Sequence, residues 1–175
     1  MSESGPTPAR SYYQGFSLVP PNDPGWVVIS NTRVEFALRK DGADRDESYV
    51  VHGRVMKLPE FPTRDAFFTA ASKPPPVLST SGRFRYLSYS TRSAPEKGEM
   101  CVRNSSVAED HNPARPSSRT DLMILEVYSL VCAHLQRPTA GIMVIYSQRY
   151  YPGNRDPRLE MSADKLFATV TFTDF

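Results

Sequence analysis

The sequence has little that would mark a membrane protein or a disulfide-rich protein. Only two of its 175 residues are cysteines, Cys101 and Cys132, which are too few for a disulfide framework and lack CxxC spacing. No stretch reaches the roughly 18 apolar residues that a membrane-spanning helix needs. The best candidate, Leu122 to Leu135, is interrupted by Glu126 and His134. We therefore expect no transmembrane segment.

Basic runs and common catalytic motifs are missing as well. The 21 Lys and Arg residues are interleaved with 19 Asp and Glu residues, and the net charge is only +2. Nucleic-acid-binding proteins usually gather their basic residues on one face, so we expect no nucleic-acid partner. The sequence has no GxSxG elbow, phosphate-binding glycine loop, GxGxxG turn or HExxH helix. We expect no catalytic residues and no cofactor, and a non-enzymatic role is favoured.

The chain length fits one domain preceded by a polar segment. Residues 1–24 are rich in Pro, Ser and Gly, which predicts a flexible lead-in with its aromatic residues docked on a single α+β domain over 25–175. The first residues lack the basic and apolar regions of a signal peptide. We expect a periplasmic or envelope-associated protein if a signal has been removed, and a cytoplasmic one otherwise.

Alternating apolar and polar residues predict antiparallel strands along most of this domain. The strands are expected at 26–29 continuing into 32–38, and at 48–58, 84–90, 99–108, 122–133 and 141–151. The segment 122–133 is almost continuously apolar, which is typical of a central strand buried on both faces.

Two helices complete the prediction. Thr63 is a suitable N-cap and Asp65 lies in the first turn of a short helix over 64–72. The second helix begins at Asp156–Pro157 and carries an apolar stripe to Val170. Residues 169–175 form either its fraying end or a brief terminal strand. The predicted fold is a twisted antiparallel sheet of about six to seven strands flanked by two helices, in the order ββαββββα.

The two cysteines have more than one interpretation. If Cys101 and Cys132 lie on neighbouring strands they form a structural disulfide, and otherwise they are two small buried hydrophobic residues. With His134 they would supply three zinc ligands, but no other residue has metal-ligand spacing, so we expect no metal site.

The most distinctive polar and aromatic segment spans residues 146–153. Tyr146, Arg149, Tyr150 and Tyr151 would make a partner-binding surface, because Tyr and Arg are favoured at interface hot spots. The alternative is that these aromatic rings pack on the terminal helix.

Two other polar patterns have competing interpretations. Glu109 to His111 resembles an acid–base cluster, but its Pro-rich surroundings favour a solvated loop. Basic residues also share a strand face in two pairs, His52 with Arg54 and Arg83 with Arg85. If the two strands were neighbours, the pairs would hold a carboxylate or phosphate.

The last third of the chain resembles uncharacterised envelope lipoproteins of proteobacteria. Those proteins carry a C-x-H element, a strand ending in Tyr-Ser-x-Arg and a closing amphipathic helix before a terminal Phe. The matching segments here are Cys132 to His134, Tyr146 to Arg149, and Leu159 to Phe172. The order of elements is also similar to the PsbP-like fold, which implies a sheet between helices and an accessory or binding role.

Two functional hypotheses follow from these patterns. The first is a non-enzymatic accessory or binding protein of the bacterial cell envelope that meets a protein partner through an exposed patch of Tyr and Arg at 146–153. The second is a small-ligand-binding or hydrolytic domain, with an apolar pocket between the sheet and the helix around Phe67.

Overall fold

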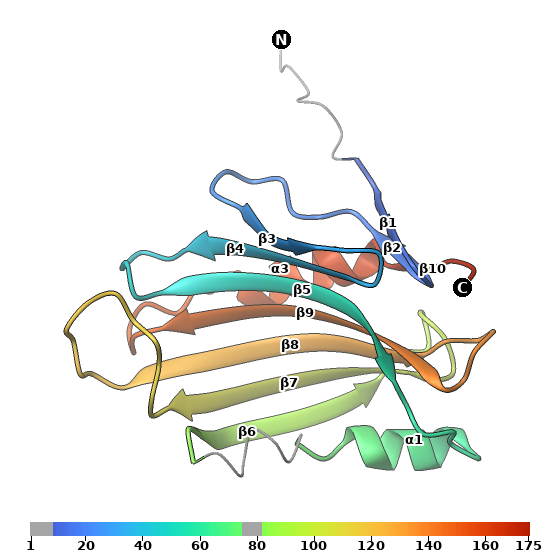
Figure 1. Ribbon diagram of the computed structural model, residues 1–175. Coiled ribbons are helices and arrows are strands. Elements are labelled where there is room, and N and C mark those ends of the chain that lie inside the picture. Colours follow the sequence, from blue (N-terminus) through green and yellow to red (C-terminus); the bar gives the residue numbers. More distant parts are fainter. Residues whose placement is uncertain (1–8, 75–81) are drawn as a thin grey trace.

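A seven-stranded antiparallel sheet forms the centre of the molecule in the computed structural model, which describes residues 9–74 and 82–175. Its strands are β3 (Val27–Asn31), β4 (Glu35–Asp41), β5 (Ser48–Lys57), β6 (Phe84–Ser93), β7 (Cys101–Asp110), β8 (Met123–Ala133) and β9 (Ala140–Tyr150). Their order across the sheet is β3-β4-β5-β9-β8-β7-β6 (Figure 1). The α+β class, the antiparallel sheet and the two predicted helices are confirmed.

The path of the chain explains this order. Strands β3, β4 and β5 follow one another as hairpins, and the chain then crosses in front of the sheet to α1 (Arg64–Ala71) beside the far edge. From there β6 to β9 return strand by strand until β9 pairs with β5 over ten positions, from Ser48 opposite Arg149 to Lys57 opposite Ala140. The two meanders therefore close on each other at the centre of the sheet.

A second, three-stranded sheet was not predicted. It is made of β1 (Ser11–Tyr13), β2 (Phe16–Leu18) and β10 (Thr171–Phe172), with β2 in the middle. Gly15, in the turn between β1 and β2, has a φ of +82°, and an added Cβ would lie 2.7 Å from the Phe175 ring, so glycine suits this turn best.

This sheet corrects two predictions. Residues 11–18, assigned to the flexible lead-in 1–24, form two strands with Phe16 and Leu18 fully buried, while residues 1–8 lie outside the described residues. The observed order is also longer than ββαββββα, because 26–38 divides into β3 and β4 and because β1, β2 and β10 are added. The turn between β3 and β4 is closed by the Thr32 N–H donating to the Glu35 carbonyl at 2.7 Å.

The helix α3 (Leu159–Ala168) covers one face of the sheet (Figure 1). It begins two residues after the predicted Pro157, and the Asp156 carboxylate accepts a hydrogen bond from the Arg158 N–H at 2.9 Å just before it. It ends before Val170 because Thr171 and Phe172 pair with β2, so the terminal-strand alternative is the one observed. Its buried side chains are Leu159, Ala163, Leu166 and Phe167.

The opposite face of the sheet is covered less completely. The Thr63 hydroxyl caps α1 by accepting from the Ala66 N–H at 3.1 Å, as predicted, but Phe67 is the one buried residue of this helix. The expectation that β8 is buried on both faces is wrong, since Leu125 and Val127 are only half-buried. The side chains opposite to those packed on α3 line a cavity instead. None of the described helices is long and apolar enough to span a membrane.

Candidate ligand-binding site

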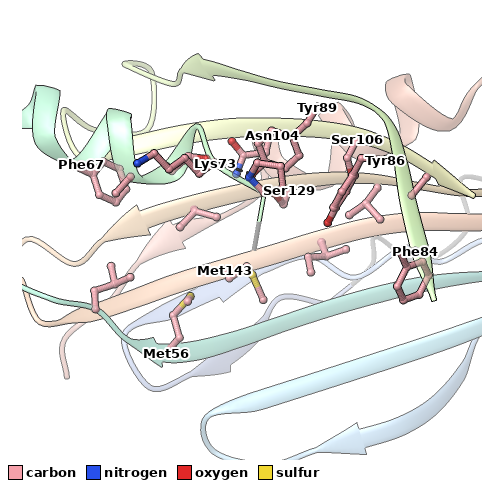
Figure 2. Close-up of a pocket in the computed structure, with 18 of the residues that line it drawn as sticks. Met56, Phe67, Lys73, Phe84, Tyr86, Tyr89, Asn104, Ser106, Ser129 and Met143 are labelled. Atoms are coloured by element: carbon pink, nitrogen blue, oxygen red, sulfur yellow. Dashed lines mark hydrogen bonds between the residues drawn. The ribbon is translucent and has the colours of Figure 1, made fainter. Parts of the chain in front are cut away.

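A cavity of about 560 Å³ lies between α1 and the sheet face that α3 leaves uncovered. Ligand pockets in proteins usually enclose roughly 300–1,000 Å³. The residues that line the cavity come from α1, from the segments on either side of it and from five strands (Figure 2). The apolar lining residues include Phe67, Phe84, Leu125, Val127, Val131 and Met143.

The cavity floor is formed by side chains in cross-strand register. Val131 lies opposite Met143, and Leu125 lies opposite Ala108, so apolar residues form both ends of the floor. These side chains point to one face because residues two apart on a strand share a face. The same register sends Leu130 and Cys132 to the α3 side, where both are buried in the core.

A polar row crosses the middle of this floor. Thr91 on β6 is paired with Asn104 on β7, and Asn104 with Ser129 on β8. The Thr91 hydroxyl donates to the Asn104 amide oxygen at 2.8 Å. The Ser129 hydroxyl has no hydrogen-bond partner among the residues that the structure describes, nor has that of Ser106, one pleat further along β7. A ligand in the cavity would therefore meet a few hydrogen-bonding groups on an otherwise apolar surface.

The wall formed by α1 and β6 is held by few polar contacts. The Tyr89 hydroxyl donates to the Ala71 carbonyl at 3.2 Å, and Arg64 donates to the Ser93 hydroxyl at the same distance. Burial raises the pKa of Tyr89, and the neighbouring Tyr86 adds to this effect, so both rings enter the cavity wall as neutral phenols. Lys73 lines the α1 end of the cavity and is exposed (Figure 2).

A charged cluster stands on the same sheet face, beyond the other end of the cavity. The Asp110 carboxylate is fully buried and accepts two hydrogen bonds from Arg83, at 2.8 and 2.9 Å. The Arg149 Nε lies 3.2 Å from the second Asp110 oxygen. Burial alone would raise the pKa of Asp110, but the Arg83 hydrogen bonds and the charge of Arg149 hold it below its usual value. The carboxylate is therefore ionised between two cations.

The predicted partner-binding residues are not exposed together. Tyr146, Tyr150 and Tyr151 are buried, which contradicts the expected patch of Tyr and Arg on the surface. The Tyr150 hydroxyl donates to Glu126 at 3.0 Å, and that of Tyr151 donates to Asp46 at 2.6 Å. These tyrosines donate hydrogen bonds to buried carboxylates. The spacing of the tyrosines in the sequence does not reveal these partners. A partner-binding role for the segment stays a prediction.

The cysteines are joined to each other. Cys101 and Cys132 lie directly opposite on β7 and β8 and form a disulfide, S–S 2.06 Å, within the core under α3. His134 is bonded elsewhere, because its Nε2–H donates to the Thr173 carbonyl at 2.8 Å. Over residues 9–74 and 82–175, no group of three His, Cys, Asp or Glu could hold a metal ion.

The other polar patterns are also rearranged. The strands that carry His52–Arg54 and Arg83–Arg85 are separated by β9, β8 and β7, so the proposed basic patch does not form from these pairs. Glu109 and Asp110 end β7 rather than occupying a loop, and they point to opposite faces. Arg85 and His111 pair with Glu109 on one face, and Arg83 meets Asp110 on the other.

Comparisons with known proteins add a distant structural likeness. No protein-family model matches the sequence, and a search of curated proteins finds no match to it. Among solved structures, the chain is similar to a mutant of the protein Mog1, with a TM-score of 0.48 and 10% sequence identity, over 95% of this chain and 97% of that one. A likeness this distant identifies no family.

Proposed function

We propose that the protein binds a small apolar or amphipathic molecule in the cavity between α1 and the sheet. The observation that carries this proposal is the half-buried apolar floor. Apolar side chains on β8 and β9 that would pack under a helix in a closed fold face an open space of about 560 Å³ instead. An exposed apolar surface of this kind usually marks a site where another molecule binds.

The expected affinity is moderate. Each buried methylene group of a ligand contributes about 0.8 kcal/mol, so a chain with about eight buried methylenes gains roughly 6 kcal/mol. That gain corresponds to a Kd of about 40 µM before hydrogen bonds and the cost of ordering the ligand are counted. Hydrogen bonds to the polar row at Asn104 and Ser129 would fix the orientation of the ligand.

The hydrolytic alternative has no support in the cavity. General acid–base catalysis needs a titratable group within hydrogen-bond reach of the substrate. The sequence has three histidines, and each lies near a partner outside the cavity: His52 near Glu35, His111 near Glu109, and His134 near the Thr173 carbonyl. No histidine therefore lies beside Ser129 or Ser106 to activate it, and we favour a binding role.

The expected envelope setting belongs to the same proposal. A disulfide between Cys101 and Cys132 persists more readily in an oxidising compartment than in a reducing cytoplasm. We also propose a PsbP-like architecture, which the antiparallel sheet with helices on both sides supports. An accessory protein of the envelope that carries a small ligand would combine both hypotheses.

A matched pair of variants tests the binding site. Ala70 lines the cavity from α1 and is exposed, whereas Thr69 is the next residue back, equally exposed and not part of the lining. We expect Ala70→Trp to weaken binding of the uncharged fluorescent probe N-phenyl-1-naphthylamine at least tenfold, and Thr69→Trp to leave it within twofold. Equal binding by both variants, or no probe binding by the unchanged protein, would overturn the proposal.

A further inference from the structure

We infer that the ligand is an anionic amphiphile, with its apolar chain in the cavity and its acid head group at Arg149. This inference rests on the proposed function and names the class of molecule that the same site takes. The shared chemistry of the head group is a small oxyanion, either a carboxylate or a phosphate. Arg149 and the charges around it carry the inference.

Arg149 lies directly beyond the cavity floor. On β9 it is the cross-strand partner of Leu125, which lines the cavity from β8. Cross-strand partners have Cβ atoms about 4.5–5.5 Å apart, so an arginine side chain reaches the end of the floor easily. On the other side of Leu125 lies Ala108, also a lining residue, followed along β7 by Asp110. Among the described residues, the cavity floor therefore continues along β8 to Leu125, the direct cross-strand neighbour of the arginine.

The guanidinium of Arg149 has unused hydrogen-bond donors in the described part of the chain. Its side chain is only 23% exposed, yet its buried Nε has no hydrogen-bond partner in the described part of the chain, because the Asp110 oxygen 3.2 Å away is not in line with the N–H. No other hydrogen bond joins this guanidinium to a described residue. A buried donor without an acceptor costs about 1–3 kcal/mol, and the two terminal NH2 groups, which no described residue hydrogen-bonds, are the donors that an oxyanion can reach.

The charges around Arg149 leave an excess of positive charge. Arg83 and Arg149 share the single carboxylate of Asp110, and the more exposed Arg39 pairs with Asp41 at 3.3 Å. Among the described residues, three cations thus face two carboxylates. Burial lowers the pKa of Arg149, the charges of Arg83 and Arg39 act in the same direction, and Asp110 opposes them. One further anion would balance these charges.

The dimensions of the floor suit an extended chain. From Val131 to Leu125 the strand β8 covers about 20 Å at roughly 3.4 Å per residue. The two cationic positions stand at opposite ends of this path, Lys73 at the α1 end and Arg149 at the other. Lys73 is exposed and hydrated, whereas Arg149 is largely buried and offers a planar set of donors that matches an oxyanion. The head group is therefore assigned to Arg149.

The experiment compares four competitors with one chain length. Dodecanoate, dodecyl phosphate, dodecanol and dodecylammonium are tested for displacement of N-phenyl-1-naphthylamine from the purified protein at pH 7.5, the three ions below their critical micelle concentrations and dodecanol below its solubility limit. We expect at least one of the two anions to bind tenfold or more tightly than dodecanol, and dodecylammonium to bind more weakly than dodecanol. The tighter of the two anions identifies the head group. Equal binding of both anions and dodecanol would overturn the inference while leaving the proposed function intact.

Three variants locate the head group. Arg149→Gln should reduce the affinity for the preferred anion to that for dodecanol and leave dodecanol within twofold. Lys73→Gln and Arg85→Gln should keep the preference, since Arg85 pairs with Glu109 on the other face. Loss of the preference in Lys73→Gln alone would place the head group at α1 and contradict the assignment. If Arg149→Gln does not fold, Arg149→Lys serves instead, and retention of the full preference by that variant would count against a planar contact.

Discussion

The two faces of the central sheet differ in how deeply their apolar side chains are buried. On the α3 face, Leu130, Ile142 and Val144 are almost completely buried against the helix. On the cavity face, their neighbours Val131, Met143 and Ile145 are only half-buried. The strands are equally apolar on both sides, so the difference comes from the covering helix. One face is closed by α3, and the other lines the cavity in which we propose that a ligand binds.

Two of the buried carboxylates, Glu126 under α3 and Asp110 on the cavity face, have different surroundings. Glu126, on the α3 face, accepts two hydrogen bonds from Arg155 and one each from Tyr128 and Tyr150, and its single charge is matched by a single cation. Asp110, on the cavity face, is shared by two arginines. The carboxylate under α3 is therefore matched by one arginine, whereas two arginines contact the carboxylate on the open face.

The largest difference between the faces should be seen in unfolding free energy. Phe167→Ala empties a space in the α3 core, where the ring is 2% exposed, and should cost about 3–5 kcal/mol. Val127→Ala only enlarges a space that already exists and should cost about 1 kcal/mol. Chemical denaturation of both variants measures the two values. Similar losses would mean that the cavity face is packed as well.

Loss of the disulfide should affect the α3 face alone. The bond closes a loop with a sequence separation of 31, and the chain-entropy model gives about 3–4 kcal/mol for a loop of this length. Cys101→Ala with Cys132→Ala should therefore lower the unfolding free energy by about 2–4 kcal/mol and leave probe affinity within twofold.

The natural protein in reductant provides the control for that double variant. It should lose a similar amount of stability, and the double variant should not respond to reductant. A large drop in probe affinity on reduction would show that the two faces are coupled through β7 and β8.

The balanced carboxylate predicts an acid-sensitive contribution to stability. Burial tends to raise the pKa of Glu126, but the hydrogen bonds from Arg155, Tyr128 and Tyr150 lower it overall. A lowered pKa in the folded state stabilises the protein above the unfolded value, about 4.3, and this contribution is lost as the pH falls below it. Glu126→Gln should cost about 1–2 kcal/mol at pH 7, a reduced value because Arg155 is 44% exposed. The difference from the natural protein should shrink at pH 3, and a constant difference in urea titrations would contradict this account.

Local patterns in the sequence predicted the elements that their own residues determine. Alternation located the strands of the large sheet to within a few residues, and Thr63 and Asp65 located α1. The apolar segment 122–133 was recognised as central, but an apolar residue facing a helix looks the same in a sequence as one facing a cavity. Periodicity therefore revealed both faces of β8 without showing which one is open.

Features that depend on distant pairing could not be predicted in this way. Strands β1, β2 and β10 are two or three residues long, and β10 pairs with β2 from the opposite end of the chain. Arg83 and Arg149 meet at Asp110 only because the strand order β9-β8-β7-β6 brings them together. The tyrosines of 146–153 were expected to be exposed, yet their hydroxyls serve carboxylates from remote segments. Local patterns in a single sequence do not reveal that strand order.

The smallest effect distinguishes two serines on the cavity face. Ser129 and Ser147 are similarly buried, at 8% and 7% exposure, but Ser147 donates to the Val50 carbonyl at 3.4 Å, whereas the Ser129 hydroxyl faces the cavity without a partner in the described residues. An apolar ligand must strip water from the Ser129 hydroxyl, so Ser129→Ala should raise the affinity for N-phenyl-1-naphthylamine by up to about threefold, within the roughly 1 kcal/mol of an unmade hydrogen bond. Ser147→Ala should leave this affinity unchanged and lower stability by about 0.5 kcal/mol, the low end for a lost hydrogen bond. If Ser129→Ala instead lowers the affinity for the probe, the polar row contributes directly to binding. The half-buried valine, leucine and methionine side chains of the floor would then not be the sole source of the affinity.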